Sequence, residues 1–260
     1  MRLKDLKKAA KKKLPVLKEA GFIIWQGPSL YDGAPLVAIA TMQSANEKTG
    51  NMVQVWILRQ DIAPHDAILE GSDGSICGDC PLKSGGGCYE LTWRAPTQVY
   101  AAFLRGVYVD ISADLARISL IAASREVRLG AYGDPAFVPY AIIQALISRA
   151  NGHTGYTHQW DQPWFDARFL KYCMASANNT DDARFLEKAN IRYFLAVDGD
   201  TNVPKGTVVC PNLTHGVQCR DCLLCSGGKM GKNVVTELHG AKKRLAAVNL
   251  SMSISKNNFY

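Results

Sequence analysis

The sequence predicts an α/β protein with a largely parallel sheet. Apolar runs of strand length alternate with segments of helical periodicity from about residue 96 to residue 211, and strands and helices at this spacing form right-handed βαβ units. No strand is followed by G-x-G-x-x-G or G-x-x-x-x-G-K-[ST], the phosphate-binding motifs of open nucleotide-binding sheets. No Pro/Ser/Gly-rich linker divides the chain. We therefore expect residues 1–260 to form one domain, a full or partial β/α barrel of the TIM-barrel type.

The first elements are predicted from apolar patterns and their flanking turns. Residues 35–42 (PLVAIATM) and 52–58 (MVQVWIL) have strand composition, and the polar QSANEKTGN between them predicts a hairpin or a strand pair. Residues 96–106 and 112–124 have the apolar spacing of helices. The run at 126–135 predicts a buried strand that ends in a turn.

The second half of the chain continues the alternation. A helix is predicted at 139–152, because Asn151 and Gly152 form a stop signal. Another is predicted at 180–191, with Thr180 as its N-cap. Short apolar runs predict the remaining strands, at 153–160, at the end of 166–177, at 192–200 and at 206–211.

Composition limits the compartment. The 260 residues are 47% hydrophobic, enough for one large core or two small ones. The longest apolar runs fall far short of the roughly 20 residues that a membrane span requires. The N-terminus, MRLKDLKKAAKKKLP, has no continuous apolar stretch behind it, so we expect no secretory signal and a cytoplasmic protein. In a reducing cytoplasm, clustered cysteines serve as metal ligands or redox groups rather than as disulfides.

Positive charge is concentrated at the two ends of the chain, and the net charge is +7. Residues 1–20 are basic and have helical apolar spacing, which predicts an amphipathic N-terminal helix. A second basic group follows the last cysteine and comprises Lys229, Lys232, Lys242, Lys243 and Arg244. Two interpretations of these charges remain open: solvated helix faces, or electrostatic contacts with nucleic acid.

The segment 210–230 contains four cysteines in the pattern C-x8-C-x2-C-x2-C: Cys210, Cys219, Cys222 and Cys225. Two successive C-x2-C steps bring three thiolates to one place, which suits an iron–sulfur cluster better than a single zinc ion. Pro211 follows the first of these cysteines, as in the Cys-Pro that often ends ferredoxin-type ligand runs. The pattern predicts a [4Fe–4S] cluster, with zinc as the alternative.

The segment 71–90 contains three more cysteines in the pattern C-x2-C-x7-C: Cys77, Cys80 and Cys88. Three ligands leave a fourth position, which either another residue completes or a substrate or cofactor occupies. The candidate residues are His65, His158, Cys173 and His215. A zinc knuckle with a histidine as fourth ligand is the alternative. Cys173 lies among apolar residues, so we expect it to be a buried core thiol.

Polar residues stand where predicted strands end, the position of functional residues in β/α barrels. Asp134 follows VRLGAYG and His158 follows GYT. We expect both to lie in the candidate active site, and the ordinary pKa of histidine suits proton transfer near neutral pH. A hydrogen-bonded histidine with a structural role only is the alternative for His158.

This order of motifs resembles the radical S-adenosylmethionine superfamily. The chain has an early cysteine loop (CGDCPL…CYE), a strand that ends in Gly-Asp-Pro (VRLGAYGDP), βα units and a late cysteine segment (CP…CRDCLLC). The layout looks closest to uncharacterised phage- and plasmid-associated proteins within or beside that superfamily, and this implies a bacterial or phage-infected host cell.

The resemblance implies ligands for two cofactors. Cys77, Cys80 and Cys88 would hold a [4Fe–4S] cluster, and the late cysteines an auxiliary cluster. The turn formed by Gly133, Asp134 and Pro135 would contact S-adenosylmethionine. Two features depart from the superfamily pattern, which has C-x3-C-x2-C in the early loop and more often a glutamate at the position of Asp134.

The sequence therefore predicts a cluster-dependent redox or radical enzyme, which takes an electron from a donor and acts on a small molecule of unknown identity. The alternative is a protein stapled by zinc, which binds DNA or RNA through its basic ends without catalysis.

Overall fold

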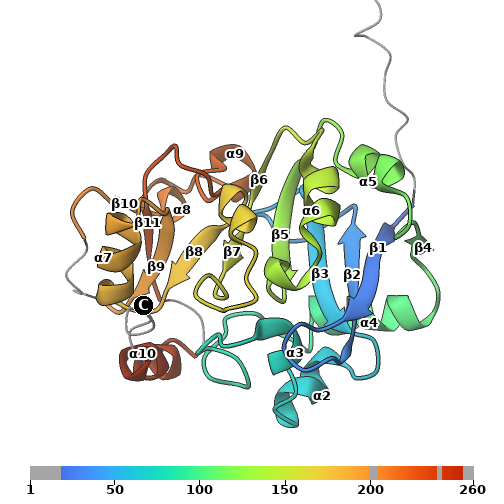
Figure 1. Cartoon of the computed structure of the whole chain (residues 1–260), viewed down its shortest axis with the longest axis horizontal. Coiled ribbons are helices and arrows are strands. Elements are labelled where there is room, and N and C mark those ends of the chain that lie inside the picture. The colour runs from blue at the N-terminus through green and yellow to red at the C-terminus, as the bar shows by residue number, and fades with distance from the viewer. Residues whose placement is uncertain (1–18, 200–203, 239–241, 254–260) are drawn as a thin grey trace, which may run out of the picture.

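The computed structural model describes residues 19–199, 204–238 and 242–253, and the strands lie side by side through the middle of the molecule (Figure 1). The first sheet contains six of the described strands: β1 (Gly21–Pro28), β2 (Pro35–Thr41), β3 (Val53–Arg59), β4 (Val109–Asp110), β5 (Glu126–Tyr132) and β6 (Gly152–Thr154). Their order is β4-β1-β2-β3-β5-β6. β2 is antiparallel to both neighbours, and the other pairings are parallel.

The second sheet contains five short parallel strands: β7 (Tyr156–Thr157), β8 (Met174–Ala177), β9 (Tyr193–Val197), β10 (Val208–Val209) and β11 (Val234–Glu237), in the order β10-β11-β9-β8-β7. Gly155 joins the two sheets, because it stands between β6 and β7. Its N–H donates to the carbonyl of Cys225 at 2.9 Å, and its own carbonyl accepts from the N–H of Met174 at 3.0 Å. A Cβ atom at Gly155 would lie 2.9 Å from the sulfur of Cys173, so this passage favours glycine.

The expected mixed α/β fold with parallel strands is confirmed, but a closed barrel is not found among the described strands. β4 and β10 form the outer edges, and each pairs with one neighbour only. The barrel does not close because a barrel of β/α units would need another parallel strand next to β3. The antiparallel strand β2 occupies that place and extends the sheet outward instead.

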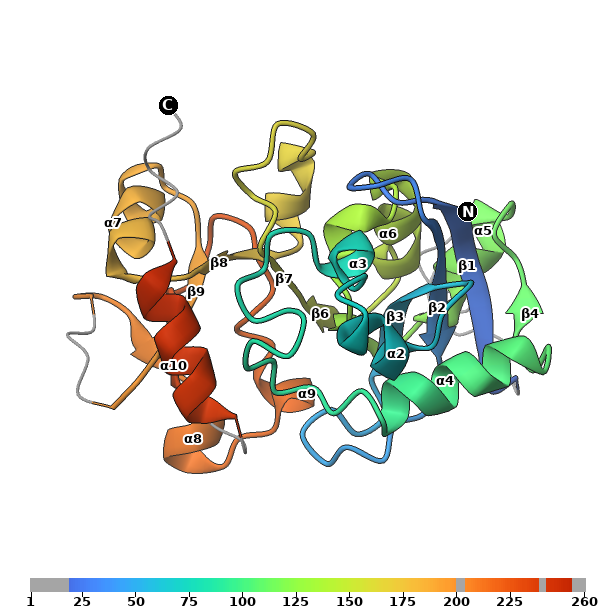
Figure 2. The ribbon, with the colours of Figure 1, turned by 90° about the horizontal axis from the view of Figure 1, so that it is seen from below.

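Helices cover both sides of the strands. Figure 2 shows α6 (Tyr140–Ile147) and α7 (Thr180–Lys188) on one side, and α4 (Ala95–Leu104) and α8 (Pro211–His215) on the other. The described part of the chain also contains α10 (Lys243–Met252), the shorter helices α2 (Pro64–Leu69), α3 (Gly74–Cys77), α5 (Leu115–Ile121) and α9 (Cys219–Cys222), and the 3₁₀ helices η1 (Pro135–Phe137) and η2 (Ala167–Lys171).

Each sheet carries its own hydrophobic core. The first core surrounds β1, β2, β3 and β5, where Ile24, Leu36 and Ile57 are fully buried. The second lies between α7 and the strands β8 and β9, and it includes Leu186 and Leu195. Cys173 is buried in the first core, which confirms its expected place.

Several predicted boundaries differ from the structure. The helix expected at 112–124 begins only at Leu115, because the Asp114 carboxylate accepts a hydrogen bond from the N–H of Arg117. The N-cap of α7 is Asn179 and not Thr180, since the Asn179 side chain accepts hydrogen bonds from the N–H groups of Asp181 and Asp182. β1, β11 and α10 were not predicted from the sequence, and neither were the short elements β4 and α2.

The expected basic helix at residues 1–20 lies almost entirely outside the described residues. Within the described part of the chain, no helix is both long and apolar enough to span a membrane.

Candidate metal and ligand site

Both cysteine segments open onto one cavity of about 430 Å³, which lies against one face of the two sheets. β5 contributes Arg128, Gly130, Ala131 and Tyr132 to its wall, because the strand bulges at Gly130, where φ is +65°, and its residues do not simply alternate between the two faces. Neighbouring elements add further residues to the wall: Tyr156, His158, Phe194, Ala196, Thr236 and Leu238. The cavity wall also includes four cysteines: Cys77, Cys80, Cys88 and Cys210.

The early cysteine segment is fixed by the carboxylate of Asp73. This carboxylate accepts hydrogen bonds from the N–H and the hydroxyl of Ser84, at 2.6 and 2.5 Å. Asp73 immediately precedes α3, and Cys77 is the last residue of that helix. Lys83 donates a further hydrogen bond to the carbonyl of Gly78. These contacts fold residues 73–84 into a compact loop.

The glycines before Cys88 allow α10 to approach this loop. Gly87 has a φ of +116°, and a Cβ atom there would lie 2.6 Å from the backbone of Ala246. Asn249 of α10 donates a hydrogen bond to the carbonyl of Gly86. In Figure 2 the loop between α3 and α4 accordingly runs beside α10. The glycine insert thus packs the early segment against the C-terminal helix.

Burial raises the pKa of all three early thiols, because a thiolate loses hydration there. The pKa of Cys80 rises to about 12. Negative charge on Cys80 and Cys88 would raise the pKa of Cys77 further. A metal that binds these sulfurs must therefore displace their protons.

The late cysteine segment starts at the second sheet and returns to the first. Cys210 follows β10 and precedes α8, whereas Cys219 and Cys222 form the two ends of α9. The N–H of Arg220 donates to the carbonyl of Lys48 at 3.2 Å. The segment is therefore anchored to both sheets, which agrees with the bond between Cys225 and the glycine that joins them.

Arg192 holds the loop that carries Cys225. The residue is 7% exposed, and its guanidinium donates to the carbonyls of Leu224 and Gly227 at 2.7 Å, and of Lys232 at 2.6 Å. It makes no ion pair with a carboxylate in the described part of the chain. A buried cation requires a counter-charge, and negative charge on Cys225 would stabilise this one.

Two further side chains approach the late thiols from the cavity wall. Burial raises the pKa of the Cys225 thiol to about 12. The hydroxyl of Tyr156 is hydrogen-bonded to this thiol and partly opposes the rise in its pKa. Burial and negative charge on Cys210 raise the pKa of Cys219, and the positive charge of Arg128 partly opposes that rise. Its Nη2 donates to the hydroxyl of Tyr89 at 3.0 Å.

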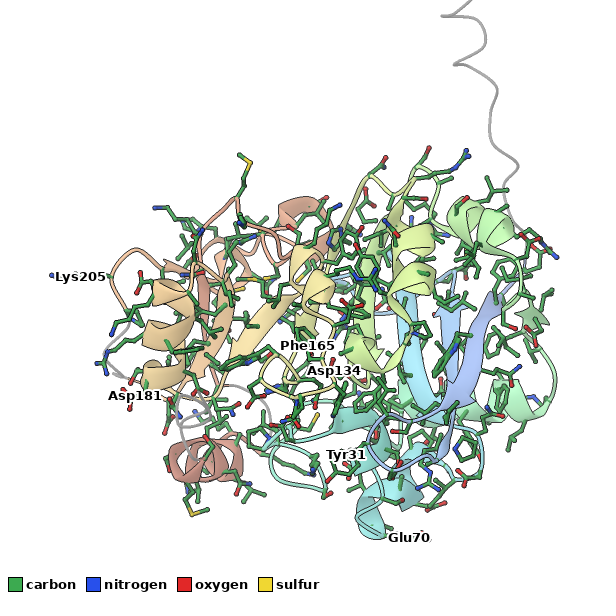
Figure 3. All side chains as sticks on the ribbon, in the orientation of Figure 1. Tyr31, Glu70, Asp134, Phe165, Asp181 and Lys205 are labelled. Carbon is green, nitrogen blue, oxygen red and sulfur yellow. The ribbon has the colours of Figure 1, made fainter. Side chains whose placement is uncertain are left out.

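Asp134 connects three parts of the site, and Figure 3 shows it near the centre of the molecule. Its N–H donates to the carbonyl of Ile76, beside Cys77, at 2.8 Å. Its carboxylate accepts four hydrogen bonds, from Ala136 N–H (3.0 Å), Thr157 Oγ1 (3.2 Å), His158 N–H (2.8 Å) and Gln159 Nε2 (3.3 Å). Burial raises its pKa to about 6, although these donors favour the ionised form.

The other residues of the predicted turn support this arrangement. Gly133 has a φ of +78°, and a Cβ atom there would lie 2.7 Å from the carbonyl oxygen of Ile57. Pro135 begins η1 and is buried. Gln159 also donates to the carbonyl of Cys77 at 2.9 Å, so the turn and the early cysteine segment form one connected unit.

The candidates for a fourth early ligand are widely separated. His158 lines the cavity together with the early cysteines. His65 lines a second, smaller cavity that also contacts Cys88. His215 is exposed and lies 2.6 Å from the hydroxyl of Thr214, and Cys173 is in the core. Of the four, His158 alone lines the main cavity.

The sequence analysis missed Arg128, Tyr132 and Tyr156 as site residues. A usable signal was present in the strand predicted at 126–135. Arg128, Gly130 and Tyr132 alternate there with the apolar residues Val127, Leu129 and Ala131, and such alternation marks a strand whose two faces differ.

The seven clustered cysteines are all partly buried free thiols. No three His, Cys, Asp or Glu side chains in the described ranges converge closely enough to hold a single metal ion. A scan against protein-family models, a search of curated proteins and a search of solved structures each gave no match to this chain.

Proposed function

We propose that this chain is an iron–sulfur protein that carries out redox or radical chemistry in its central cavity. The early cysteines and the late cysteines would each hold a [4Fe–4S] cluster, on a partial β/α barrel. One observation carries the proposal: the three early thiols and Cys210 of the late segment, far apart in the sequence, line the same cavity. A protein that used the two segments only as separate structural staples would not need a shared cavity.

The donor set and the charges around it fit such clusters. The ligands at both segments are thiols, the donors that iron–sulfur clusters prefer. Arg192 and Arg128 place positive charge beside the late thiols without forming ion pairs with carboxylates among the described residues. A cluster bound by four thiolates is anionic, so these cations would balance it and the Tyr156 hydroxyl would donate to one of its ligands.

Bound clusters would supply one-electron chemistry. The chain's own residues would shape the reaction space. Asp134 has both carboxylate oxygens engaged by protein donors, so we assign it a positioning role that joins the early loop, β5 and β7. His158 lines the cavity and is the candidate for proton transfer. The turn at Gly133, Asp134 and Pro135 remains the proposed contact for S-adenosylmethionine.

The test is anaerobic purification followed by iron, sulfide and zinc analysis and an absorption spectrum. We expect about eight irons and eight sulfides per chain if both segments are loaded. Cys222→Ala and Cys80→Ala should each remove about half of the iron. Cys173→Ala is the matched control, because this thiol is buried in the core; it should keep its iron and cost about 1–2 kcal/mol of stability. Stoichiometric zinc without sulfide would refute the redox function and favour a zinc-stapled nucleic-acid-binding protein.

A further inference from the structure

Tyr132 lines the cavity and carries an unused hydrogen-bond donor in the described part of the chain. The residue is 5% exposed, and its hydroxyl is buried without a hydrogen-bond partner among the described residues. Burial raises the pKa of Tyr132, as would negative charge on Cys77 and Cys88, so the O–H group stays protonated. A buried hydroxyl that makes no hydrogen bond loses its hydration without compensation. A molecule bound in the cavity that Tyr132 lines could supply the missing partner.

Arg128 presents an unpaired cation on the same wall. It stands four residues before Tyr132 on β5, and both side chains line the cavity with Gly130 between them. Its one hydrogen bond to a side chain goes to the neutral hydroxyl of Tyr89. Glu90 acts on its pKa through charge, but the two form no ion pair. A guanidinium has five N–H donors, so several remain for a ligand.

We propose that the cavity binds a small organic anion. Its carboxylate or phosphate group would pair with Arg128, and an acceptor atom elsewhere in the molecule would take the hydrogen bond from Tyr132. β5 bulges at Gly130, so that Arg128 and Tyr132 pair with Gln54 and Trp56, only two residues apart on β3. Two residues of a strand span about 7 Å, so the two groups of the ligand would lie on the order of 7 Å apart. The apolar side chains of Phe194 and Leu213 would contact the body of the molecule. A cavity of about 430 Å³ is of the size that holds such ligands.

The small organic anion would be the substrate of the enzyme proposed above. Its conversion after binding rests on that proposed function, whereas its binding does not. The binding itself uses Arg128 and Tyr132 and requires no metal. The experiment uses one probe with a carboxylate and one with a phosphate, and so tests which of the two groups the cavity binds.

The test is calorimetric titration of the full chain, purified anaerobically with the metal that it holds. AMP probes the phosphate arm, hippurate probes the carboxylate arm, and inorganic phosphate probes the Arg128 end alone. We expect at least one of the two organic anions to bind. Arg128→Gln should weaken that binding by about a hundredfold, since it removes a charge-assisted pair. Tyr132→Phe should weaken it about tenfold and leave the binding of inorganic phosphate unchanged.

If Arg128→Gln fails to fold, thermal unfolding of Tyr132→Phe provides a second test. Tyr132→Phe removes an unpartnered hydroxyl, so the free protein should unfold at a higher temperature while it binds the organic anion less tightly. A merely structural tyrosine would not shift stability and affinity in opposite directions. Tyr193→Phe is the control, because Tyr193 is a fully buried tyrosine of β9 that does not line the cavity. It should leave the affinity unchanged.

The proposal is overturned if neither organic anion binds at millimolar concentration, or if both variants bind as tightly as the wild type. Metal analysis of the same samples separates this result from the test of the proposed function. If the protein binds the anion but contains no iron, the anion site is supported and the iron–sulfur function is refuted. If the protein contains iron but does not bind the anion, the iron–sulfur function is supported and the anion site is refuted.

Discussion

Replacement of Arg192 by methionine should detach the late cysteine segment from the second sheet. The guanidinium donates to three carbonyl oxygens between residues 224 and 232, and methionine retains much of the apolar stem but none of the donors. The three carbonyls would then be left without this partner in a buried setting. Such a change affects both the stability of the fold and the ability of Cys225 to bind metal.

The expected loss of stability can be worked out from these contacts. Hydrogen bonds that involve a charged group contribute about 2 kcal/mol each, so three bonds amount to about 6 kcal/mol. The Nε atom of Arg192 is buried without a partner among the described residues, and that unmet donor offsets about 1–2 kcal/mol. We expect Arg192→Met to lower the free energy of unfolding by about 4–5 kcal/mol. Arg192→Lys should lose about half of that, because an ammonium reaches fewer of the carbonyls.

The assay is urea denaturation together with metal analysis of the purified variants. Arg184→Met serves as the control, because Arg184 is 63% exposed and pairs with Asp181, itself 61% exposed. An exposed pair of this kind contributes about 0.5 kcal/mol, and its loss should leave the metal content unchanged. If Arg192→Met unfolds within about 1 kcal/mol of the wild type and keeps all of its metal, the assigned role of Arg192 is wrong.

Two further predictions concern the turn at Asp134 and the contact with α10. The pKa of Asp134 is raised to about 6 from an ordinary value of 3.8. Its contribution to stability is therefore complete below pH 3.8 and is lost as the pH rises through 6. Between pH 4 and pH 7 the free energy of unfolding of Asp134→Asn should gain up to about 3 kcal/mol relative to that of the wild type, and a difference independent of pH would contradict this. Gly87→Ala should cost about 2–3 kcal/mol and expose α10 to limited proteolysis, because its Cβ atom would meet Ala246 at a positive φ. Gly106→Ala is the control with a positive φ but nothing within 4 Å, and an equal loss in both variants would refute the packing argument.

The sequence predicted the elements whose signals are local. The pair at 35–42 and 52–58 became β2 and β3, and the helix at 180–191 became α7. Each has an apolar period and a turn or cap next to it, which fix its type without help from distant residues. The division of the thiols into an early and a late ligand group stays a prediction from the cysteine spacings.

What the sequence did not predict depends on contacts between distant residues. The barrel stayed open because β2 takes the place beside β3, and no local pattern states which strand will pair with β3. Asp134 was expected as a site residue, but three of its four donors come from residues 157–159, more than 20 residues further along the chain. The shared cavity was not predicted either, since it requires the late segment to return to Lys48 and Gly155.

The return of the late segment to the first sheet affects the order in which parts of the chain fold. The wall of the cavity includes Cys77 near the first third of the chain and Cys210, Leu238 and Leu250 near its end. During synthesis from the N-terminus, the early thiols leave the ribosome well before the residues that will cover them. The cavity is therefore the last part of the molecule to close, and a chain truncated before residue 210 would expose the early thiols permanently to solvent and to any metal or oxidant dissolved in it.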